Sequence, residues 1–201
     1  MARRSQAERS DTTTTRLISA ARLLFGRDGY TTTSIDAVAA AAGVTKGAAY
    51  HHFKGKADLF RAVFVREQEE IAAGLERVAL AAPDSWTALR YGVRAFLERC
   101  TDPAFRQVVL LDGPAVLGWD GVRAIEYDHT LRVLAEGMRA AADDGRIVAG
   151  DLAARTQMIF GALCEAGMLL ARSGDPAAAL PAVEAEAEHL LSALATQAQP
   201  Q

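Results

Sequence analysis

The sequence predicts an all-α protein, and three observations support this fold class. Alanine, the strongest helix former, makes up about a fifth of the 201 residues, whereas aromatic residues make up only 6%. Apolar residues recur at spacings of three and four along most of the chain. No segment shows the alternating pattern of a half-buried strand.

Glycine and proline turn signals divide this pattern into about nine helices. The first is expected to run from Thr15 to Gly29. Gly113-Pro114 and Asp144-Gly145 are among the expected breaks between later helices. The remaining helices are expected at residues 33–43, 45–54, 56–78, 84–99, 103–111, 119–142, 152–172 and 176–197.

Several helix ends are marked by residues that suit them. Thr33-Ser34-Ile35-Asp36 has the pattern of a capping box, in which the Thr33 hydroxyl accepts from the backbone three residues on and Asp36 reaches back. Gly43 suits the left-handed conformation that commonly terminates a helix, and Gly29 and Gly55 are expected to end the helices on either side.

Charge is divided unevenly along the chain. The whole sequence has a net charge of −3, but residues 1–56 hold nine Lys and Arg against four Asp and Glu, which gives +5 there and −8 for residues 57–201. This asymmetry predicts a basic nucleic-acid-binding domain at residues 1–56, with a mobile basic arm at residues 1–10, and an acidic domain with another role at residues 57–201. A basic tail that serves only solubility would have the same charge, so the motifs must decide.

Residues 33–56 have the layout of a helix-turn-helix, with two short helices joined by a glycine-containing turn and followed by lysines. Small Ala39 and Gly43 allow the two helices to approach each other, and Val44 can fill the corner between them. Ala49 and Phe53 lie four residues apart and are expected to face the core.

The other face of the second helix is expected to be polar and to enter a DNA major groove. Small Gly47 and Ala48 let the backbone approach the bases. Lys54, Lys56 and the positive N-terminus of the following helix suit a backbone phosphate. Tyr50 could instead pack in the core. The polar residues of this face are Thr45, Lys46, Tyr50, His51 and His52.

The segment TTTSIDAVAAAAGVTKGAAYHHFKGKADL, residues 31–59, resembles the DNA-binding signature of TetR-type transcriptional regulators. The resemblance implies a three-helix DNA-binding head, a larger helical body that binds a small molecule and forms a homodimer, and repression that the small molecule relieves. One departure is Ala49, where the family often has a larger Leu, Ile or Phe. Matching positions imply phosphate contacts by Thr33 or Ser34, Tyr50, His52 and Lys56, and base contacts by Thr45, Lys46, Ala48 and His51.

The last two expected helices carry more apolar surface than one buried stripe requires. The resemblance implies that they pair with their copies in a dimer that reads a pseudo-palindromic operator. These stripes could instead belong to the monomer core.

The resemblance also implies a ligand cavity, and few inward-looking charges in the central region predict an apolar or neutral ligand. The candidate lining residues, all bulky or polarizable, are Phe96, Cys100, Phe105, Val109, Trp119, Tyr127, Phe160, Cys164 and Met168.

Other classes of function lack a motif. His51 and His52 are adjacent on a helix, so their side chains diverge by about 100° and cannot share a metal ion without outside ligands. No Ser-His-Asp order, Gly-rich phosphate loop or His-Glu-x-x-His pattern is present, so neither an enzyme nor a cofactor is expected. Cys100 and Cys164 are expected to be buried thiols.

The chain lacks an apolar segment long enough to span a membrane and lacks a signal-peptide core, which predicts a soluble cytoplasmic protein. The main alternative to a DNA-binding regulator is a helical small-molecule-binding or interaction protein with a degenerate DNA-binding head.

Overall fold

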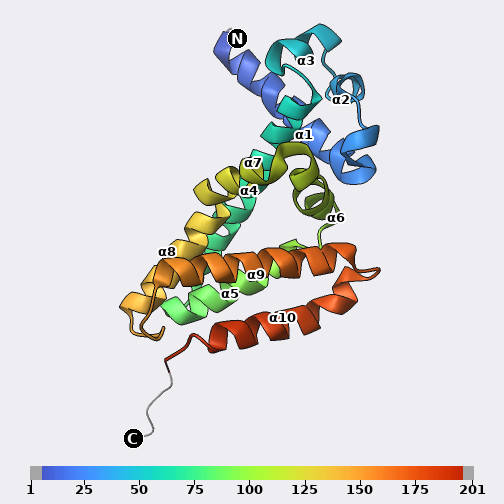
Figure 1. Cartoon of the computed structure of the whole chain (residues 1–201). Helices are drawn as coiled ribbons and strands as arrows, with labels where there is room; N and C mark the ends of the chain where they lie inside the picture. The colour runs from blue at the N-terminus through green and yellow to red at the C-terminus, as the bar shows by residue number, and fades with distance from the viewer. Residues whose placement is uncertain (1–5, 197–201) are drawn as a thin grey trace, which may run out of the picture. The chain divides into compact units, whose positions relative to one another are not determined.

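The computed structural model describes residues 6–196 (Figure 1). The protein is all-α, as the sequence predicts. A π-helical segment, η1 (Arg106–Asp112), lies between the sixth and seventh α-helices. The α-helices are α1 (Gln6–Thr32), α2 (Ile35–Ala41), α3 (Lys46–His52), α4 (Lys56–Ala81), α5 (Ser85–Arg99), α6 (Pro103–Phe105), α7 (Gly113–Asp128), α8 (Thr130–Asp143), α9 (Leu152–Arg172) and α10 (Pro176–Ser192). Helices α6, η1 and α7 follow one another without interruption, and if they are counted as one, the described residues form nine helices.

The chain packs as two compact units. The N-terminal unit contains the described residues up to Glu67 together with residues 103–122, and the C-terminal unit contains residues 68–102 and the described residues from Arg123 onward. The boundaries fall inside α4 and α7, so both helices pass from one unit to the other. The predicted functional division at residue 56 therefore differs from the division by packing, and it stays a prediction.

No described helix has both the length and the apolar composition needed to cross a membrane.

An aromatic cluster forms part of the core of the N-terminal unit. The rings of Phe25 and Tyr30 in α1 each lie 5.2 Å, centroid to centroid, from the ring of Phe60 in α4. The contacts are edge-to-face, the geometry that aromatic quadrupoles favour. Beside this cluster, Arg22 of α1 pairs with the buried carboxylate of Glu67. These contacts fix α1 against the first half of α4.

Helix α1 also approaches α6 closely at Gly26. A Cβ atom on Gly26 would lie 2.6 Å from the Cβ atom and 2.8 Å from the Cα atom of Ala104. Because the second of these is a backbone atom, a side chain could fit only if the two helices moved apart. Glycine at this position is therefore required by packing.

We expect the Gly26→Ala substitution to lower the free energy of unfolding by about 1–3 kcal/mol, the usual range for overpacking in a core. The matched control is Gly74→Ala in α4, where the nearest atom to an added Cβ is 3.8 Å away. That control should stabilise the protein by up to about 1 kcal/mol through helix propensity. Urea titrations of both variants give the comparison, and equal effects would contradict the steric explanation.

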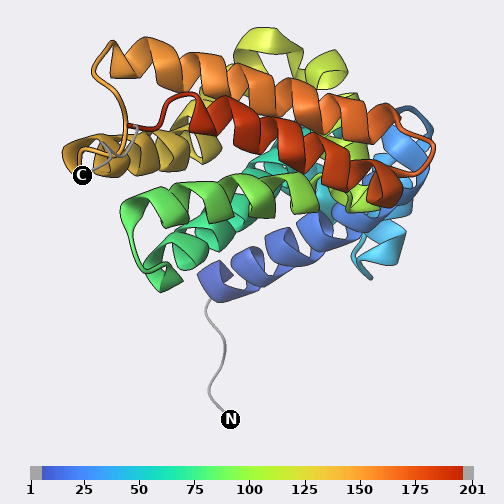
Figure 2. The same cartoon turned by 90° about the horizontal axis from the view of Figure 1, so that it is seen from below.

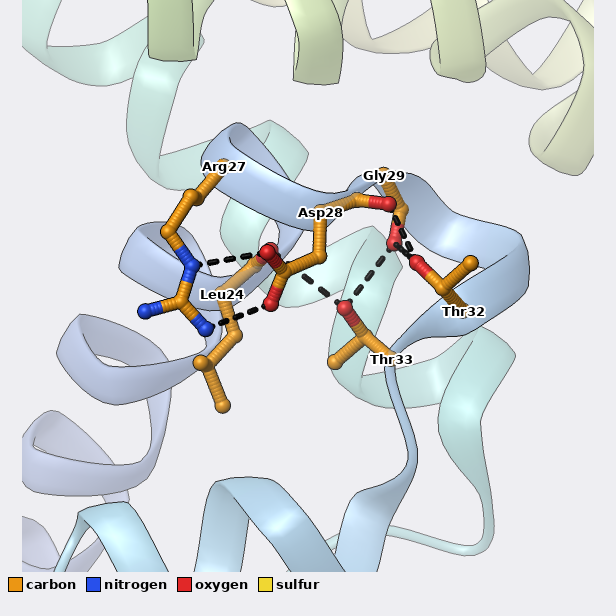
Figure 3. Close-up of polar contacts among 6 residues, drawn as sticks. All are labelled: Leu24, Arg27, Asp28, Gly29, Thr32 and Thr33. Carbon is orange, nitrogen blue, oxygen red and sulfur yellow. Dashed lines mark hydrogen bonds and ion pairs between the residues drawn. The ribbon is translucent and has the colours of Figure 1, made fainter.

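The end of α1 contains a break at Gly29 that Thr33 stabilises (Figure 3). Gly29 has φ +78°, a left-handed conformation that favours glycine, and it ends the regular part of α1 as predicted. The hydroxyl of Thr33 lies 2.9 Å from the Gly29 carbonyl, to which it donates, and 3.3 Å from the Leu24 carbonyl. Thr33 is buried, and its hydroxyl bonds carbonyls on both sides of the break, which ties the start of the next segment to the end of α1.

The predicted capping box is wrong by one residue. Ser34, not Thr33, is the N-cap of α2, and its hydroxyl accepts a hydrogen bond of 3.1 Å from the backbone N–H of Ala37. Asp36 does not reach back, because its carboxylate pairs with Lys46 at 2.6 Å. The hydroxyl of Thr33 is already committed to α1, which leaves Ser34 as the cap.

One predicted break is also misplaced. Gly113-Pro114 does not interrupt the helix, because Gly113 has helical backbone angles of φ −49° and ψ −56°. Gly113 also packs closely, since an added Cβ would lie 2.6 Å from the Phe64 ring. Pro114 lies at the junction where the helix changes from η1 to α7. The chain bends instead at Gly118, with φ +72°, and His129 divides the helix predicted at residues 119–142 into α7 and α8.

Three helix ends differ from the predicted ones. Helix α1 starts at Gln6, so residues 6–10 are helical and not a mobile arm, and the rest of that arm lies outside the described residues. Helix α3 ends at His52, and Gly55, which was expected to end it, instead precedes α4, with its carbonyl accepting from the Leu59 N–H at 3.1 Å. Helix α10 ends at Ser192, and the predicted end at Gln197 lies outside the described residues.

The C-terminal unit is built from the second half of α4 with α5, α8, α9 and α10. Aspartate side chains cap three of its helices: Asp84, Asp151 and Asp175 each accept from a backbone N–H in the first turn at 3.0 Å. Helices α9 and α10 lie side by side as an antiparallel pair (Figures 1 and 2).

Candidate functional site

Helices α2 and α3 form the predicted helix-turn-helix. Gly43 has φ +64° and ends α2 with a paired set of hydrogen bonds: its N–H donates to the Ala40 carbonyl, and the N–H of Val44 donates to the Ala39 carbonyl, each at 3.0 Å. Thr45 then caps α3 by accepting from the N–H of Ala48 at 3.2 Å. The turn is therefore fixed by backbone hydrogen bonds that residues 43–45 make possible.

One face of α3 is buried and the other is polar and exposed. Ala49 and Phe53 are buried, as predicted, so the small side chain at position 49 packs against the rest of the unit. Tyr50 is 47% exposed, which excludes the alternative of a core position. The exposed residues of the reading face, a name that we use for this surface, are Thr45, Lys46, Gly47, Tyr50 and His51, and Ala48 beside them is half-buried.

Lys46 is the principal cation of the reading face, and it is paired. Its ammonium lies 2.6 Å from the carboxylate of Asp36 on α2 and 5.8 Å from the centroid of the Tyr50 ring. The hydrogen bond that Lys46 donates to the Asp36 carboxylate raises the pKa of Lys46 above its ordinary value. Both side chains of the pair are more than half exposed, so a nucleic-acid acceptor can reach Lys46 by competing with Asp36.

Other predicted site residues contact the protein itself. The Nδ1 atom of half-buried His52 lies 3.1 Å from the hydroxyl of Thr14 in α1. Ser34 is exposed at the N-terminus of α2, whereas Thr33 is buried. Of the alternatives Thr33 and Ser34, the geometry favours Ser34 for an external ligand.

Lys56 is half-buried and holds the end of α1. Its ammonium donates to the carbonyls of Tyr30 and Thr31 at 2.9 and 3.3 Å and lies 4.2 Å from the centroid of the Tyr30 ring. At the same helix start, the carboxylate of Asp58 accepts from the backbone N–H of Lys54 at 3.1 Å. An anion at the N-terminus of α4 would thus compete with contacts that are already made.

Sequence reasoning missed two residues that border the reading face. Arg16 of α1 is exposed and donates to the carbonyl of Gly43 at 3.4 Å, which places a guanidinium beside the turn. Asp36 was assigned to a cap and instead orients Lys46. Neither role has a local sequence signal, because each depends on contacts between different helices.

The C-terminal unit contains a small apolar cavity of about 70 Å³. Helices α4, α5, α8 and α9 supply its lining residues, which include Phe96 and Phe160 of the nine predicted ones. The other seven do not line it. Phe105 and Val109 are core residues of the N-terminal unit, and Trp119 and Tyr127 are 65% and 61% exposed. Cys100, Cys164 and Met168 lie elsewhere in the C-terminal unit.

A group of polar side chains lies close to Phe160. The guanidinium of Arg123 is 5.1 Å from the centroid of the Phe160 ring, and its Nη1 atom is 3.3 Å from a carboxylate oxygen of Glu126. Burial raises the pKa of Glu126 to about 7 and the pKa of the Cys164 thiol to about 12. The Cys100 thiol is fully buried, and burial raises its pKa as well. Both thiols are therefore protonated and unreactive at neutral pH.

Helices α9 and α10 present an apolar groove of about 430 Å³. Leu169 and Leu190, two of its lining residues, are 60% and 52% exposed. Nearby on α9, Met158 is 74% exposed. Such a contiguous apolar surface is typical of a face that another protein covers.

Two family models match the chain. One, described as "Bacterial regulatory proteins, tetR family", matches residues 17–63, and the other, described as "Tetracyclin repressor-like, C-terminal domain", matches residues 86–194. Together they cover the helix-turn-helix, the α9–α10 groove and all lining residues of the cavity except Leu75 and Ala79.

Individual proteins are similar as well. A TetR-family transcriptional regulator from Pectobacterium atrosepticum has 32% identity and a TM-score of 0.84 over 98% of this chain and 100% of that one. The Transposon Tn10 TetC protein of Escherichia coli is 30% identical over 124 residues, which are 62% of this chain and 62% of TetC. RolR, solved with the ligand resorcinol, has 21% identity and a TM-score of 0.69 over 98% of this chain and 99% of RolR, which shows a shared fold.

Proposed function

Because the chain belongs to the TetR family of DNA-binding transcriptional regulators, we propose that it is a homodimeric repressor whose operator binding is relieved by a small molecule. The observation that carries this proposal is the exposed polar reading face of α3 in an N-terminal segment of net charge +5. Regulators of this family are not enzymes, in agreement with the sequence prediction.

In this proposal the reading face enters a major groove. Lys46 and His51 contact base edges, with Thr45 and Ala48 beside them. Ser34 and Tyr50 contact backbone phosphates without further rearrangement, since both are exposed. Phosphate contacts by Thr33, His52 or Lys56 require that their present hydrogen bonds be exchanged or shared.

The apolar groove of α9 and α10 supports a dimer through these helices. Gly161, Ala162 and Ala166 on α9 are small enough to let a second helix pair approach. In this proposal a two-fold dimer reads a pseudo-palindromic operator with its two copies of α3, whose binding sites lie about 34–36 Å apart when adjacent major-groove faces are read.

The cavity supports an effector role for the C-terminal unit. Its volume of about 70 Å³ is well below the roughly 300–1,000 Å³ of most ligand sites, so an effector must push the surrounding helices apart. One of them, α4, continues into the N-terminal unit and begins next to α3. An effector that binds only the expanded form would draw the population away from the form that fits DNA. The ligand named for RolR, resorcinol, is consistent with a small effector.

Replacing Lys46 with alanine should weaken binding to a preferred DNA sequence by roughly 5- to 150-fold, which corresponds to about 1–3 kcal/mol for a lost base contact. A suitable preferred sequence is one selected by the wild-type protein from duplexes with a randomised centre. Arg77→Ala, which removes an exposed cation from the C-terminal unit, is the control and should leave affinity within about twofold.

Fluorescence anisotropy at two salt concentrations measures these affinities. The proposal requires that wild-type binding weaken steeply with salt and resist competition by scrambled DNA. A protein with a degenerate head would select no sequence and show no difference between Lys46→Ala and Arg77→Ala.

A further inference from the structure

We propose that the cavity of the C-terminal unit selects small neutral molecules that carry a hydrogen-bond donor, and that Thr130 is the residue that recognises the donor. The inference rests on the proposed function and deepens it, because it assigns a chemical class to the effector. It follows from the walls of the cavity, from the hydrogen bond that Thr130 makes, and from the volume available.

The walls of the cavity are apolar. Leu75 of α4, Leu89 and Phe96 of α5, Leu134 of α8 and Phe160 of α9 are among the lining residues. Within the described part of the chain, no charged side chain lines this cavity. A carboxylate or an ammonium group would therefore lose its hydration without gaining a partner, which strongly disfavours charged ligands.

A pair of oppositely charged side chains lies next to Phe160, one of the cavity residues. Arg123 lies against the ring of Phe160, outside the set of lining residues, and forms an ion pair with Glu126. A ligand carboxylate that approached this guanidinium would have to compete with the Glu126 carboxylate, so the pair does not favour anionic ligands.

Thr130 supplies the polar feature of the cavity. Among the lining residues of the described chain, it is the only one whose side chain carries a polar atom. Its hydroxyl donates to the side-chain carbonyl of Gln68 at 2.8 Å, and both residues are buried. Since its one proton is used, the Thr130 oxygen can only accept a further hydrogen bond. A ligand must therefore bring an O–H or N–H group.

The volume limits the size of the ligand. About 70 Å³ is roughly half of the 150 Å³ in which an engineered apolar cavity binds benzene. A single ring with a short polar substituent is thus near the upper limit and already requires expansion of the walls. Gly92 of α5 lines the cavity, and a Cβ built on it meets no atom within 4 Å, so side chains placed there would fill the space.

Three probes with the same ring test the selection: benzyl alcohol, toluene and benzoate. Isothermal titration of the wild-type protein should show saturable binding of benzyl alcohol, roughly two- to tenfold weaker binding of toluene, and none of benzoate. Benzoate binding as tight as that of benzyl alcohol would overturn the proposal. So would equal affinities for the alcohol and toluene, or the absence of binding by all three.

Variants of Thr130 test whether its hydroxyl causes the preference for benzyl alcohol over toluene. Thr130→Val should bind benzyl alcohol and toluene equally, whereas Thr130→Ser, which keeps the hydroxyl, should retain the preference for the alcohol. Gly92→Val should lose both ligands, because it fills the cavity without changing its polar group. A preference for the alcohol that survives in Thr130→Val would contradict the assignment, and the comparison of probes on the wild type does not depend on any variant folding.

The test of the ligand class can be distinguished from a test of the proposed regulatory function. Release of DNA by benzyl alcohol is measured by anisotropy in a separate experiment. Selective binding without release of DNA would support the inference on the ligand and contradict the proposed coupling. Conversely, sequence-specific DNA binding by a protein that selects benzoate would support the DNA-binding role and overturn the inference on the ligand.

Discussion

Replacing Leu190 with glutamate is expected to convert the proposed homodimer into a monomer and to remove high-affinity DNA binding. Leu190 lines the apolar groove of α9 and α10 and is 52% exposed in the single chain. In a two-fold dimer the exposed half of each copy becomes buried, and each copy contributes about 0.8–1.5 kcal/mol. Their loss alone raises the dissociation constant of the dimer by roughly 10- to 150-fold, and two buried carboxylates without partners raise it further.

The effect on DNA follows from the loss of two linked reading faces. A monomer binds only half of a pseudo-palindromic operator, so affinity should fall by roughly 100- to 10,000-fold. Light scattering after size exclusion measures the mass, and anisotropy with the selected duplex measures the affinity. The matched control is Leu80→Glu, since Leu80 of α4 is 88% exposed and does not line the groove. A Leu190→Glu protein that remains a dimer would place the interface on another surface.

The second large effect concerns the buried carboxyl of Glu126. Its side chain is only 12% exposed, and burial raises its pKa from 4.5 to about 7 despite the opposing charge of Arg123. Below pH 4.5 the carboxyl is protonated in both the folded and the unfolded protein, so its ionisation does not affect stability. Between pH 4.5 and about 7 the folded protein binds more protons than the unfolded one, and stability decreases as the pH rises.

Glu126→Gln should therefore stabilise the protein at high pH and not at low pH. The difference between the two pKa values corresponds to about 3 kcal/mol at pH 8, and it should vanish near pH 4. Urea titrations of the wild type and the variant at pH 4, 6 and 8 measure it. Glu136→Gln is the control, because Glu136 is 54% exposed and pairs with Arg132 at the surface. A stabilisation by Glu126→Gln that does not change with pH would exclude ionisation as its cause.

The helices and the helix-turn-helix could be predicted because their signals are local. Gly29 and Gly43 were expected to end helices, and both have positive φ angles. The spacing of Ala49 and Phe53 placed them on the buried side of α3, and both are buried. In each case a periodicity or a backbone preference within a few residues is sufficient.

The partners of the site residues could not be predicted in the same way. Thr33 and Ser34 are adjacent hydroxyl residues, and only the position of the carbonyls at the end of α1 determines which of them caps α2. Lys56 suits a phosphate by its place in the sequence, yet the carbonyls of Tyr30 and Thr31 reach it in the folded chain. These choices depend on residues about ten to twenty-six positions away, which no local pattern contains.

By itself, the sequence determined that this protein is helical, that its basic N-terminal segment forms a helix-turn-helix, and which side of α3 is exposed, because periodicity and charge are properties of neighbouring residues. Only the tertiary structure decided that Lys46 is held by Asp36, that Phe96 and Phe160 line a cavity while Trp119 and Tyr127 do not, and that Thr130 has no proton left to donate there. Those features arise where separate helices meet. Their geometry depends on how the whole unit packs, and the pattern of one helix does not contain it.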